Sequence, residues 1–236
     1  LIGTGLNNLF EGVTICHPAQ EAALFNALHS KFDVRLHGYD EVPGKGMLHH
    51  MAKMAQADLV VPPGTKYVLH TDSDGIFKMP STPESFFWND KPTYLIRTWA
   101  SLGVPDRRHP IAKTVSDCGQ WKPYTDRQLG WDTEFYAMCL NTQAMPIEFY
   151  APYRAHIENL HKRPFLDFMV DGRNEFPQSI MDWTAMGAWA HKFMRDKFTW
   201  YDVENGQPYP MDRKKAFHSH SGFTPAIRAE IESMLT

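Results

Sequence analysis

The chain has 236 residues, of which 43% are hydrophobic, 13% aromatic and 22% charged, and its formal net charge is −3. This is the composition of an ordinary globular domain, which excludes a largely disordered chain, and the acidic balance argues against a nucleic-acid-binding protein. The three cysteines are widely spaced and form no Cys-x-x-Cys pair, which indicates neither a disulfide framework nor a zinc site.

The chain begins with Leu and contains no run of 18 apolar residues. We therefore expect a segment of a longer protein, without a membrane span inside it. The cytoplasm and the Golgi lumen both stay open as its compartment. No linker divides the sequence, so we expect one domain over residues 1–236.

The first third of the chain alternates strand and helix patterns. β-Branched or alternating apolar residues predict the strands, and apolar residues at helical spacing predict the helices. A β-α-β-α-β order favours a mixed, mostly parallel sheet flanked by helices, which is an α/β fold. The predicted strands are residues 12–19, 32–42 and 66–71, and the predicted helices are residues 20–31 and 47–55.

The rest of the chain has a looser pattern. Pro, Gly and charged residues predict a loop over residues 79–92 and a long connection over residues 103–132. The apolar patterns between and after these segments predict further regular elements. These are strands at residues 93–99 and 198–203 and helices at residues 132–142, 151–163, 182–197 and 224–235.

Two carboxylates, Asp72 and Asp74, follow directly after the predicted strand at residues 66–71. If the strand continues, both side chains point to the same side, at the strand end that opens onto the ligand crevice of a parallel α/β sheet. Their mutual repulsion is relieved when a hard divalent cation lies beside them. The alternative is a structural turn, since Asp-Ser-Asp-Gly also has good turn chemistry.

In this order of elements, the sequence resembles glycosyltransferases of the GT-A fold, the Rossmann-like fold of nucleotide-diphospho-sugar transferases. Their opening strand-helix-strand unit is similar to VTICHPAQEAALFNAL, and their Asp-x-Asp motif at a strand end is similar to YVLHTDSD. MDWTAMGAWA (181–190) and YAPYRAHIENLH (150–161) resemble a poorly characterised GT-A-like group. The resemblance implies a nucleotide-binding half over about residues 1–78, and an acceptor-side half with a C-terminal metal-ligand segment over about residues 79–236.

The resemblance also implies a divalent metal, Mn²⁺ or Mg²⁺, with Asp74 as a direct ligand and Asp72 binding metal or ribose. A third ligand in such enzymes often is a His near the C-terminus, and FHSHSG offers His218 and His220. In an extended segment these two side chains point to one side. The alternative is that both are surface histidines in a loop.

Asp182 opens the predicted helix at residues 182–197. We expect it to act on the sugar, either as the general base towards the acceptor hydroxyl or by binding donor hydroxyls. A structural role is open as well, because Ser179 and Asp182 have capping-box spacing. Met181 and Thr184 stand where the GT-A-like group has Ser and Asn, so no acceptor is inferred from the resemblance.

Three further residues are candidates for binding the nucleotide-sugar. His17 follows the first predicted strand, where GT-A enzymes bind the base, and a structural loop His is the alternative. Lys53 lies on the polar face of a predicted helix, where a solvated Lys is the alternative. Arg97 interrupts an apolar strand, which is unusual for a purely solvated charge.

The sequence therefore predicts a metal-dependent glycosyltransferase that uses a nucleotide-diphosphate sugar, with UDP-sugars favoured over GDP-sugars. The acceptor stays open among a glycan, a protein and a small molecule. Two other functions stay open: a metal-dependent phosphoesterase or nucleotide hydrolase, and a catalytically silent sugar-binding domain.

Overall fold

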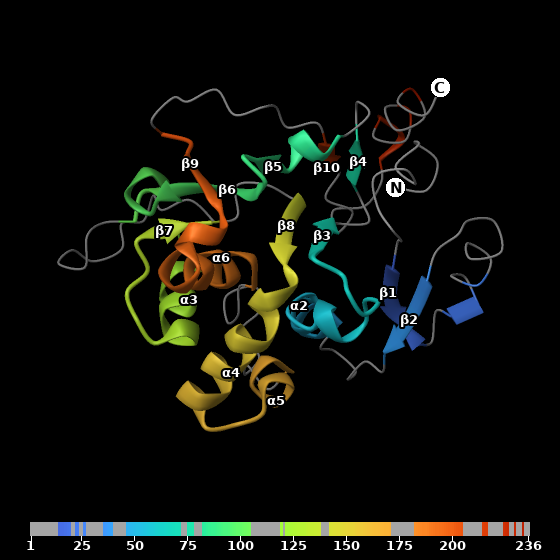
Figure 1. Cartoon of the computed structure of the whole chain (residues 1–236), viewed down its shortest axis with the longest axis horizontal. Coiled ribbons are helices and arrows are strands. Elements are labelled where there is room, and N and C mark those ends of the chain that lie inside the picture. Colours follow the sequence, from blue (N-terminus) through green and yellow to red (C-terminus); the bar gives the residue numbers. More distant parts are fainter. Residues whose placement is uncertain are drawn as a thin grey trace.

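A computed structural model describes most of the middle of the chain and parts of both ends (Figure 1). All structural statements below refer to these residues. They are 14–19, 22–23, 26, 35–39, 46–71, 75–77, 82–104, 119, 121–137, 142–170, 182–204, 214–216, 224–226, 229 and 233.

The chain opens with a parallel pair of strands. Strand β1 (Thr14–Pro18) lies beside strand β2 (Arg35–Tyr39), with Thr14 opposite Arg35 and Pro18 opposite Tyr39. The described residues between them, 22, 23 and 26, are helical. The strand-helix-strand unit expected at the start of the chain is therefore confirmed, since parallel neighbours require such a crossover.

The other strands form small sheets (Figure 1). Strand β3 (Tyr67–Thr71) pairs with β8 (Thr142–Pro146), and β4 (Gly75–Phe77) pairs with β10 (Lys214–Ala216). The longest strand, β6, has three partners. It runs from Lys91 to Thr98 and pairs with β5 (Phe87–Trp88), β7 (Phe135–Tyr136) and β9 (Thr199–Asp202).

The fold is mixed α/β, as expected, but the expectation of mostly parallel pairing is wrong for the described strands. Only β1–β2 and β6–β9 are parallel, and the other four pairs are antiparallel. The direction in which two strands pair is set by the tertiary fold. Strand β3, for example, pairs with residues 142–146, which lie far away in the sequence and lead towards the helix that starts at Tyr150. The hydrophobic period of a strand reports its burial and does not report its neighbour's direction.

A tight hairpin replaces part of the loop expected at residues 79–92. Strands β5 and β6 are joined by Asn89 and Asp90, whose φ angles are 51° and 59°. Two consecutive positive φ angles characterise the type I′ turn, whose twist matches that of the strands. Asn and Asp tolerate this left-handed conformation, so the Asn-Asp dipeptide was the sequence signal for the hairpin.

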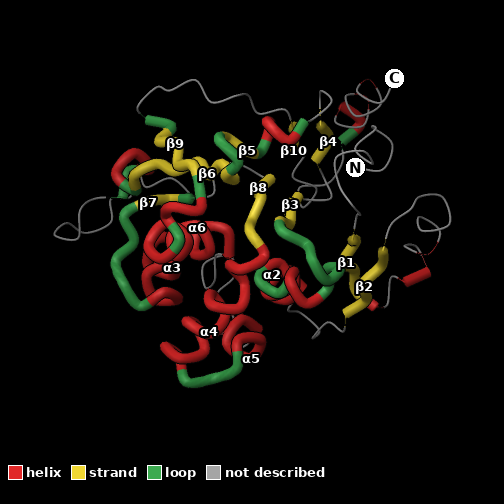
Figure 2. The backbone as a smooth tube through the Cα atoms, viewed as in Figure 1, coloured by secondary structure: helices red, strands yellow, loops and turns green. Residues whose placement is uncertain are grey.

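Among the described residues, five α-helices are described over their full length, and they lie close to one another (Figure 2). The helices expected at residues 151–163 and 182–197 are confirmed as α4 and α6, although α6 ends at Phe193 and not at residue 197. Of the expected C-terminal helix, residues 225, 226, 229 and 233 are helical. The five helices are α2 (Gly46–Met54), α3 (Lys122–Leu129), α4 (Tyr150–His161), α5 (Phe165–Val170) and α6 (Asp182–Phe193). Single 3₁₀ turns are Ala57–Leu59, Pro83–Ser85, Ala100–Leu102, Ile147–Phe149 and Arg195–Lys197.

The predictions of a connection at residues 103–132 and of a helix at residues 132–142 are wrong. Helix α3 lies within the expected connection at residues 103–132, because Pro123 fits its first turn and Gly130, at φ 80°, ends it. Strand β7 lies within the expected helix at residues 132–142, because Phe135 and Tyr136 pair with the end of β6. Aromatic residues pack well on a pleated surface, and the pairing overrides the helical pattern.

The core is formed by α2, α4, α5, α6 and the central strands. Complete burial of each large apolar side chain contributes about 1.5–3 kcal/mol relative to exposure. Several aromatic rings in the core contact one another edge to face, for example Phe149 with Trp189. The large side chains that are essentially fully buried include Tyr94, Leu129, Met145, Phe149, Tyr150, Tyr153, Ile157, Met169 and Met186.

A partly buried ion pair connects α4 to the 3₁₀ turn that follows α2. The Arg154 guanidinium of α4 donates to both carboxylate oxygens of Asp58, at 2.5 and 2.8 Å, and to the carbonyl oxygen of Ala55 at 2.8 Å. Both charged side chains are only 14% exposed. The pair therefore holds α4 against the segment that follows α2.

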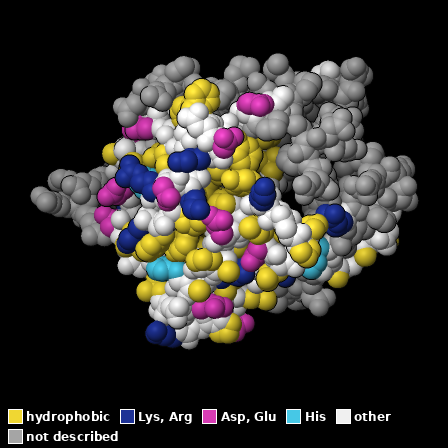
Figure 3. All heavy atoms as spheres, viewed as in Figure 1, with side chains coloured by type: hydrophobic (Ala, Val, Ile, Leu, Met, Phe, Trp, Pro, Cys, Tyr) yellow, Lys and Arg dark blue, Asp and Glu magenta, His cyan; other side chains and the backbone are white. Residues whose placement is uncertain are grey.

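On the face in Figure 3, charged side chains of both signs are interspersed among hydrophobic ones over the described residues. This mixture agrees with the small net charge of the sequence. Within the described ranges, every helix is too short or too polar to cross a lipid bilayer.

Candidate functional site

The carboxyl-terminal end of β3 is held by an aromatic cluster of His70, Tyr150 and Trp183. The Nε2 atom of His70 lies 2.6 Å from the hydroxyl oxygen of Tyr150, the first residue of α4. The His70 ring also meets Trp183 of α6 edge to face, with centroids 5.3 Å apart and an interplanar angle of 86°. One side chain of β3 thus contacts the first turns of two helices.

Tyr150 is the most deeply buried member of this cluster, with 0% of its surface exposed. Burial raises the pKa of its phenol well above the ordinary value of 10.0, and the nearby Asp58 carboxylate acts in the same direction. The phenol therefore keeps its proton at neutral pH and can donate it in a hydrogen bond to a ring nitrogen of His70.

The first turn of α6 is fixed on its other side by β6. The Tyr94 hydroxyl donates to the carbonyl oxygen of Trp183 at 3.1 Å. One turn further along α6, a Cβ atom at Gly187 would lie 2.5 Å from the Cβ of Ala137 and 2.8 Å from the Tyr94 ring. Only glycine allows this close approach of helix and strand. Helix α6 is thus seated between β6 and the end of β3.

A second pairing brings distant parts of the chain together beyond β3. Strand β4 starts at Gly75 and runs antiparallel to β10, which ends at Ala216. Gly75 is directly opposite Ala216, and Phe77 is opposite Lys214. The segment that follows the Asp-Ser-Asp motif is therefore hydrogen-bonded to the segment that precedes the His-Ser-His motif.

The four predicted metal ligands, Asp72, Asp74, His218 and His220, lie outside the described residues. The metal site stays a prediction for that reason. Among the residues that are described, His, Cys, Asp and Glu side chains form no group of three that could hold a metal ion.

The backbones of the other candidates are described. His17 lies in β1 opposite Gly38, and Asp182 is the first residue of α6. Lys53 lies in the last turn of α2 and is partly exposed. The residue after Asp182, Trp183, contacts the His70 ring and accepts a hydrogen bond from Tyr94.

Arg97 lies near the end of β6 and serves the junction between β6 and β9. Its Nε donates to the Ser101 hydroxyl at 2.9 Å. The Glu204 carboxylate at the same junction accepts from the Thr98 amide at 2.8 Å. Hydrogen bonds from Ser101 and Thr98 lower the pKa of Glu204, and the Arg97 charge adds to the effect. This is a structural role, and the proposed donor contact of Arg97 stays a prediction.

Sequence reasoning missed His70, Tyr150 and Trp183 as parts of one cluster. Trp183 and Tyr150 were recognised only as members of motifs in the second half of the chain. His70 offered a signal: it is a histidine near the end of the otherwise largely apolar YVLHT strand, two residues before Asp72. A strand of period two places such residues on one face.

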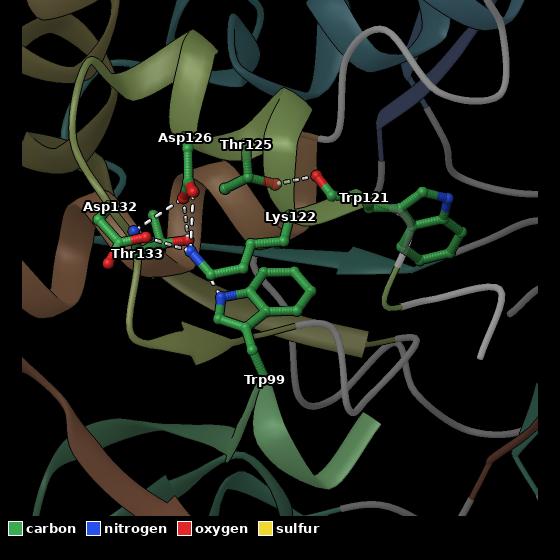
Figure 4. A network of polar contacts seen from close by, with 7 residues as sticks. All are labelled: Trp99, Trp121, Lys122, Thr125, Asp126, Asp132 and Thr133. Carbon is green, nitrogen blue, oxygen red and sulfur yellow. Dashed lines mark hydrogen bonds and ion pairs between the residues drawn. The ribbon is translucent and has the colours of Figure 1, made fainter. Parts of the chain in front are cut away.

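A separate polar cluster holds α3 in place (Figure 4). Lys122 donates to Asp126 at 2.7 Å and to Asp132 at 2.5 Å. Asp126 also accepts from the amide and the hydroxyl of Thr133, and Trp99 donates to the same hydroxyl at 3.0 Å. Each of the seven residues in Figure 4 forms a hydrogen bond or ion pair with another residue drawn there, which indicates a structural network that ties α3 to the segment before β7.

No protein-family model matches the sequence, and no curated protein matches it. The function of the chain is therefore inferred from its own residues, above all from the pairing of Gly75 with Ala216.

Proposed function

We propose that the chain is a metal-dependent glycosyltransferase that transfers a sugar from a nucleotide-diphosphate sugar, with UDP-sugars favoured as donors. In this proposal Asp72 and Asp74 hold Mn²⁺ or Mg²⁺ and the donor pyrophosphate, and His218 or His220 completes the metal site. Asp182 acts on the acceptor hydroxyl or binds donor hydroxyls. The GT-A fold is part of the proposal.

The observation that carries the proposal is the pairing of β4 with β10. Asp74 directly precedes Gly75, and His218 follows Ala216 by two residues. Because consecutive Cα atoms are about 3.8 Å apart, the chain length limits how far these two residues can lie from the paired strand ends. Two motifs far apart in sequence are thus tethered to neighbouring points, as a shared metal site requires.

The donor set fits a hard divalent cation. Carboxylate oxygens are the preferred ligands of Mg²⁺ and Mn²⁺, and an imidazole nitrogen is also suitable for Mn²⁺. When bound, the metal stabilises negative charge on the leaving pyrophosphate and orients it.

The position of Asp182 is supported by a second contact. Asp182 directly precedes Trp183, and Asp72 follows His70 by two residues. Since the His70 and Trp183 rings touch, the segments that lead to the two carboxylates start from adjacent points. Asp182 is the first residue of α6, and in this proposal it acts as the general base towards the acceptor hydroxyl or binds donor hydroxyls.

The start of the chain supports the donor-binding half. Parallel β1 and β2 with helical residues between them form the kind of unit that binds nucleotides at the carboxyl ends of its strands. His17 lies in β1 one residue before its end. Of the antiparallel pairs, β5–β6 and β6–β7 lie wholly in the half that binds the acceptor in this proposal, while β3–β8 and β4–β10 join the two halves.

The proposal is tested by thermal unfolding with Mn²⁺ and a panel of UDP, GDP and their sugars. A ligand at 100 times its Kd stabilises the native state by about 2.7 kcal/mol, which raises the Tm of a domain of this size by about 5 to 10 °C. We expect such a rise for the wild type and none for Asp74→Ala. Asp167→Ala, which removes an exposed carboxylate of α5, serves as the control and retains the rise.

Three results would contradict the proposal in different ways. An unchanged rise in Asp74→Ala excludes the metal role of that residue. Turnover of a phosphate ester without a sugar acceptor identifies a phosphoesterase instead. No response to any nucleotide, with or without metal, identifies a domain without donor binding.

A further inference from the structure

We propose that His70 is a positioning residue of this site: bonded to Tyr150 and packed on Trp183, it fixes the end of β3 against the first turn of α6. The inference rests on the proposed function, because these two described elements lead into the metal-binding and catalytic residues. It adds a residue that the sequence motifs do not include.

The chemistry of the contact separates it from ordinary core packing. His70 is half-buried, so an aliphatic residue at this position would fill the same space without the cost of removing part of an imidazole from water. That cost is offset by the 2.6 Å hydrogen bond to Tyr150. A hydrogen bond depends on direction as well as distance, so it specifies where the ring lies more sharply than apolar contact does.

The partners of His70 are themselves held on independent elements. Tyr150 is fully buried, and its ring packs edge to face on Phe149 with centroids 5.4 Å apart. Trp183 is only 5% exposed, and its carbonyl oxygen accepts from Tyr94 of β6. Neither partner can follow a displaced His70 ring without disturbing its own neighbours, since protein cores are close-packed.

The position of the contact along β3 makes it relevant to the site. His70 is followed within β3 only by Thr71, whose hydroxyl lies 3.5 Å from that of Thr142 in β8. Beyond β3, the chain passes directly to Asp72. A misplacement of about 1 Å at a reacting group can cost about 100-fold in rate, so a rigid anchor at this point has a functional consequence.

The chain supplies a matched pair of variants for the test. Tyr150 and Tyr153 both lie on α4, both are 0% exposed, and each forms a hydrogen bond with a side chain. The Tyr153 hydroxyl accepts from Gln128 Nε2 at 2.9 Å, within the helical part of the core. Tyr150→Phe and Tyr153→Phe therefore remove the same atom from the same helix, but only Tyr150→Phe releases His70.

The experiment measures the Kd of Mn²⁺ in the presence of UDP, together with the Tm of the unliganded protein. Loss of one buried hydrogen bond is expected to lower the Tm of both variants. We expect Tyr150→Phe to weaken Mn²⁺ binding about three- to tenfold, and Tyr153→Phe to change it less than about twofold. Equal Mn²⁺ affinities in the two variants would show that His70 only packs against its neighbours and does not position the metal site.

A second pair of variants decides the matter if Tyr150→Phe does not fold. His70→Gln keeps a group that can bond to the Tyr150 hydroxyl, whereas His70→Leu keeps only the packing. Weaker Mn²⁺ binding by His70→Leu than by His70→Gln supports the inference, and equal binding overturns it. If the wild type itself binds no Mn²⁺ with any nucleotide, the proposed function fails and the positioning role fails with it.

Discussion

Gly187 shows how strongly a single residue constrains α6. The helix passes so close to β6 and to the residue after β7 that an added methyl group meets Ala137 and the Tyr94 ring. The same Tyr94 donates to Trp183, so the close approach at Gly187 and the position of the first helical turn depend on each other. Glycine is therefore needed at position 187 so that α6 can approach β6 closely, although glycine is a poor helix former.

We predict that Gly187→Ala destabilises the protein. Alanine gains about 1 kcal/mol of helix propensity, but overpacking at contacts of 2.5 and 2.8 Å costs about 1–3 kcal/mol and outweighs that gain. Urea unfolding measures the difference. The double variant Gly187→Ala with Ala137→Gly removes the nearest clashing atom, and we expect it to recover part of the loss. A more stable Gly187→Ala protein would contradict the packing argument.

One physical reason explains why the sequence did not predict the cluster of His70, Tyr150 and Trp183. A sequence pattern shows which residues share a face of one element, and it placed Asp72 and Asp74 after a strand and Asp182 at the start of a helix. The contact of His70 with Tyr150 joins residues 80 apart, and no local period encodes such a partner. A contact between two such distant elements could therefore not be predicted from the sequence.

At the scale of elements, α6 is held between β7 and β9 by His191. Its ring lies edge to face with Phe135 of β7, with centroids 4.9 Å apart, and with Trp200 of β9, at 4.8 Å. Burial lowers the pKa of His191 below its ordinary value of 6.5, and the Arg195 charge lowers it further, while Glu134 acts in the opposite direction. The folded protein therefore favours the neutral ring.

This pKa shift predicts that the stability of the fold depends on pH through His191. Below about pH 6.5 the unfolded chain binds the proton more readily than the folded chain, so stability falls as the pH decreases through this range. We expect His191→Phe, which keeps the aromatic contacts, to lose less stability than the wild type between about pH 8 and about pH 5.5. Chemical unfolding at a series of pH values measures this, and parallel curves for the two proteins would refute it.

The elements that could be predicted from sequence are the long or strongly periodic ones. Helices α4 and α6 and strand β6 are confirmed because their own side chains form the core face. Helix α3 and strand β7 were not predicted, because they are short and depend on partners. α3 is stabilised by the Lys122 network, and β7 by its pairing with β6. The antiparallel direction of β3–β8, β4–β10 and β6–β7 had no signal in the sequence, whereas that of β5–β6 had one in Asn89 and Asp90.

At the scale of the whole molecule, the ion pair of Asp58 with Arg154 connects the first and second halves of the described chain. It lies beside a core that includes residues from α2 through Phe198, so the described middle of the chain shares one hydrophobic core. Shared burial of this kind produces a single cooperative unfolding transition in most small domains.

We predict that Arg154→Ala lowers the free energy of unfolding by about 1.5–3 kcal/mol, because the Asp58 carboxylate, which is only 14% exposed, is left without its partner. The Lys197–Glu148 pair, whose side chains are 51% and 54% exposed, supplies the control, and we expect Lys197→Ala to have little effect. Denaturant unfolding measures both variants. Similar losses would show that burial of the ion pair is not what matters.

The pairing of β4 with β10 has a consequence for the time order of folding. It joins residues 75–77 to residues 214–216, so the described residues from 82 to 204 all lie in the loop that the pair closes. Contacts of such long sequence separation form slowly, because loop closure must precede the gain from the contact. During synthesis β4 has to wait until residue 216 has left the ribosome. The proposed metal site is therefore completed late, after the core that supports it has formed.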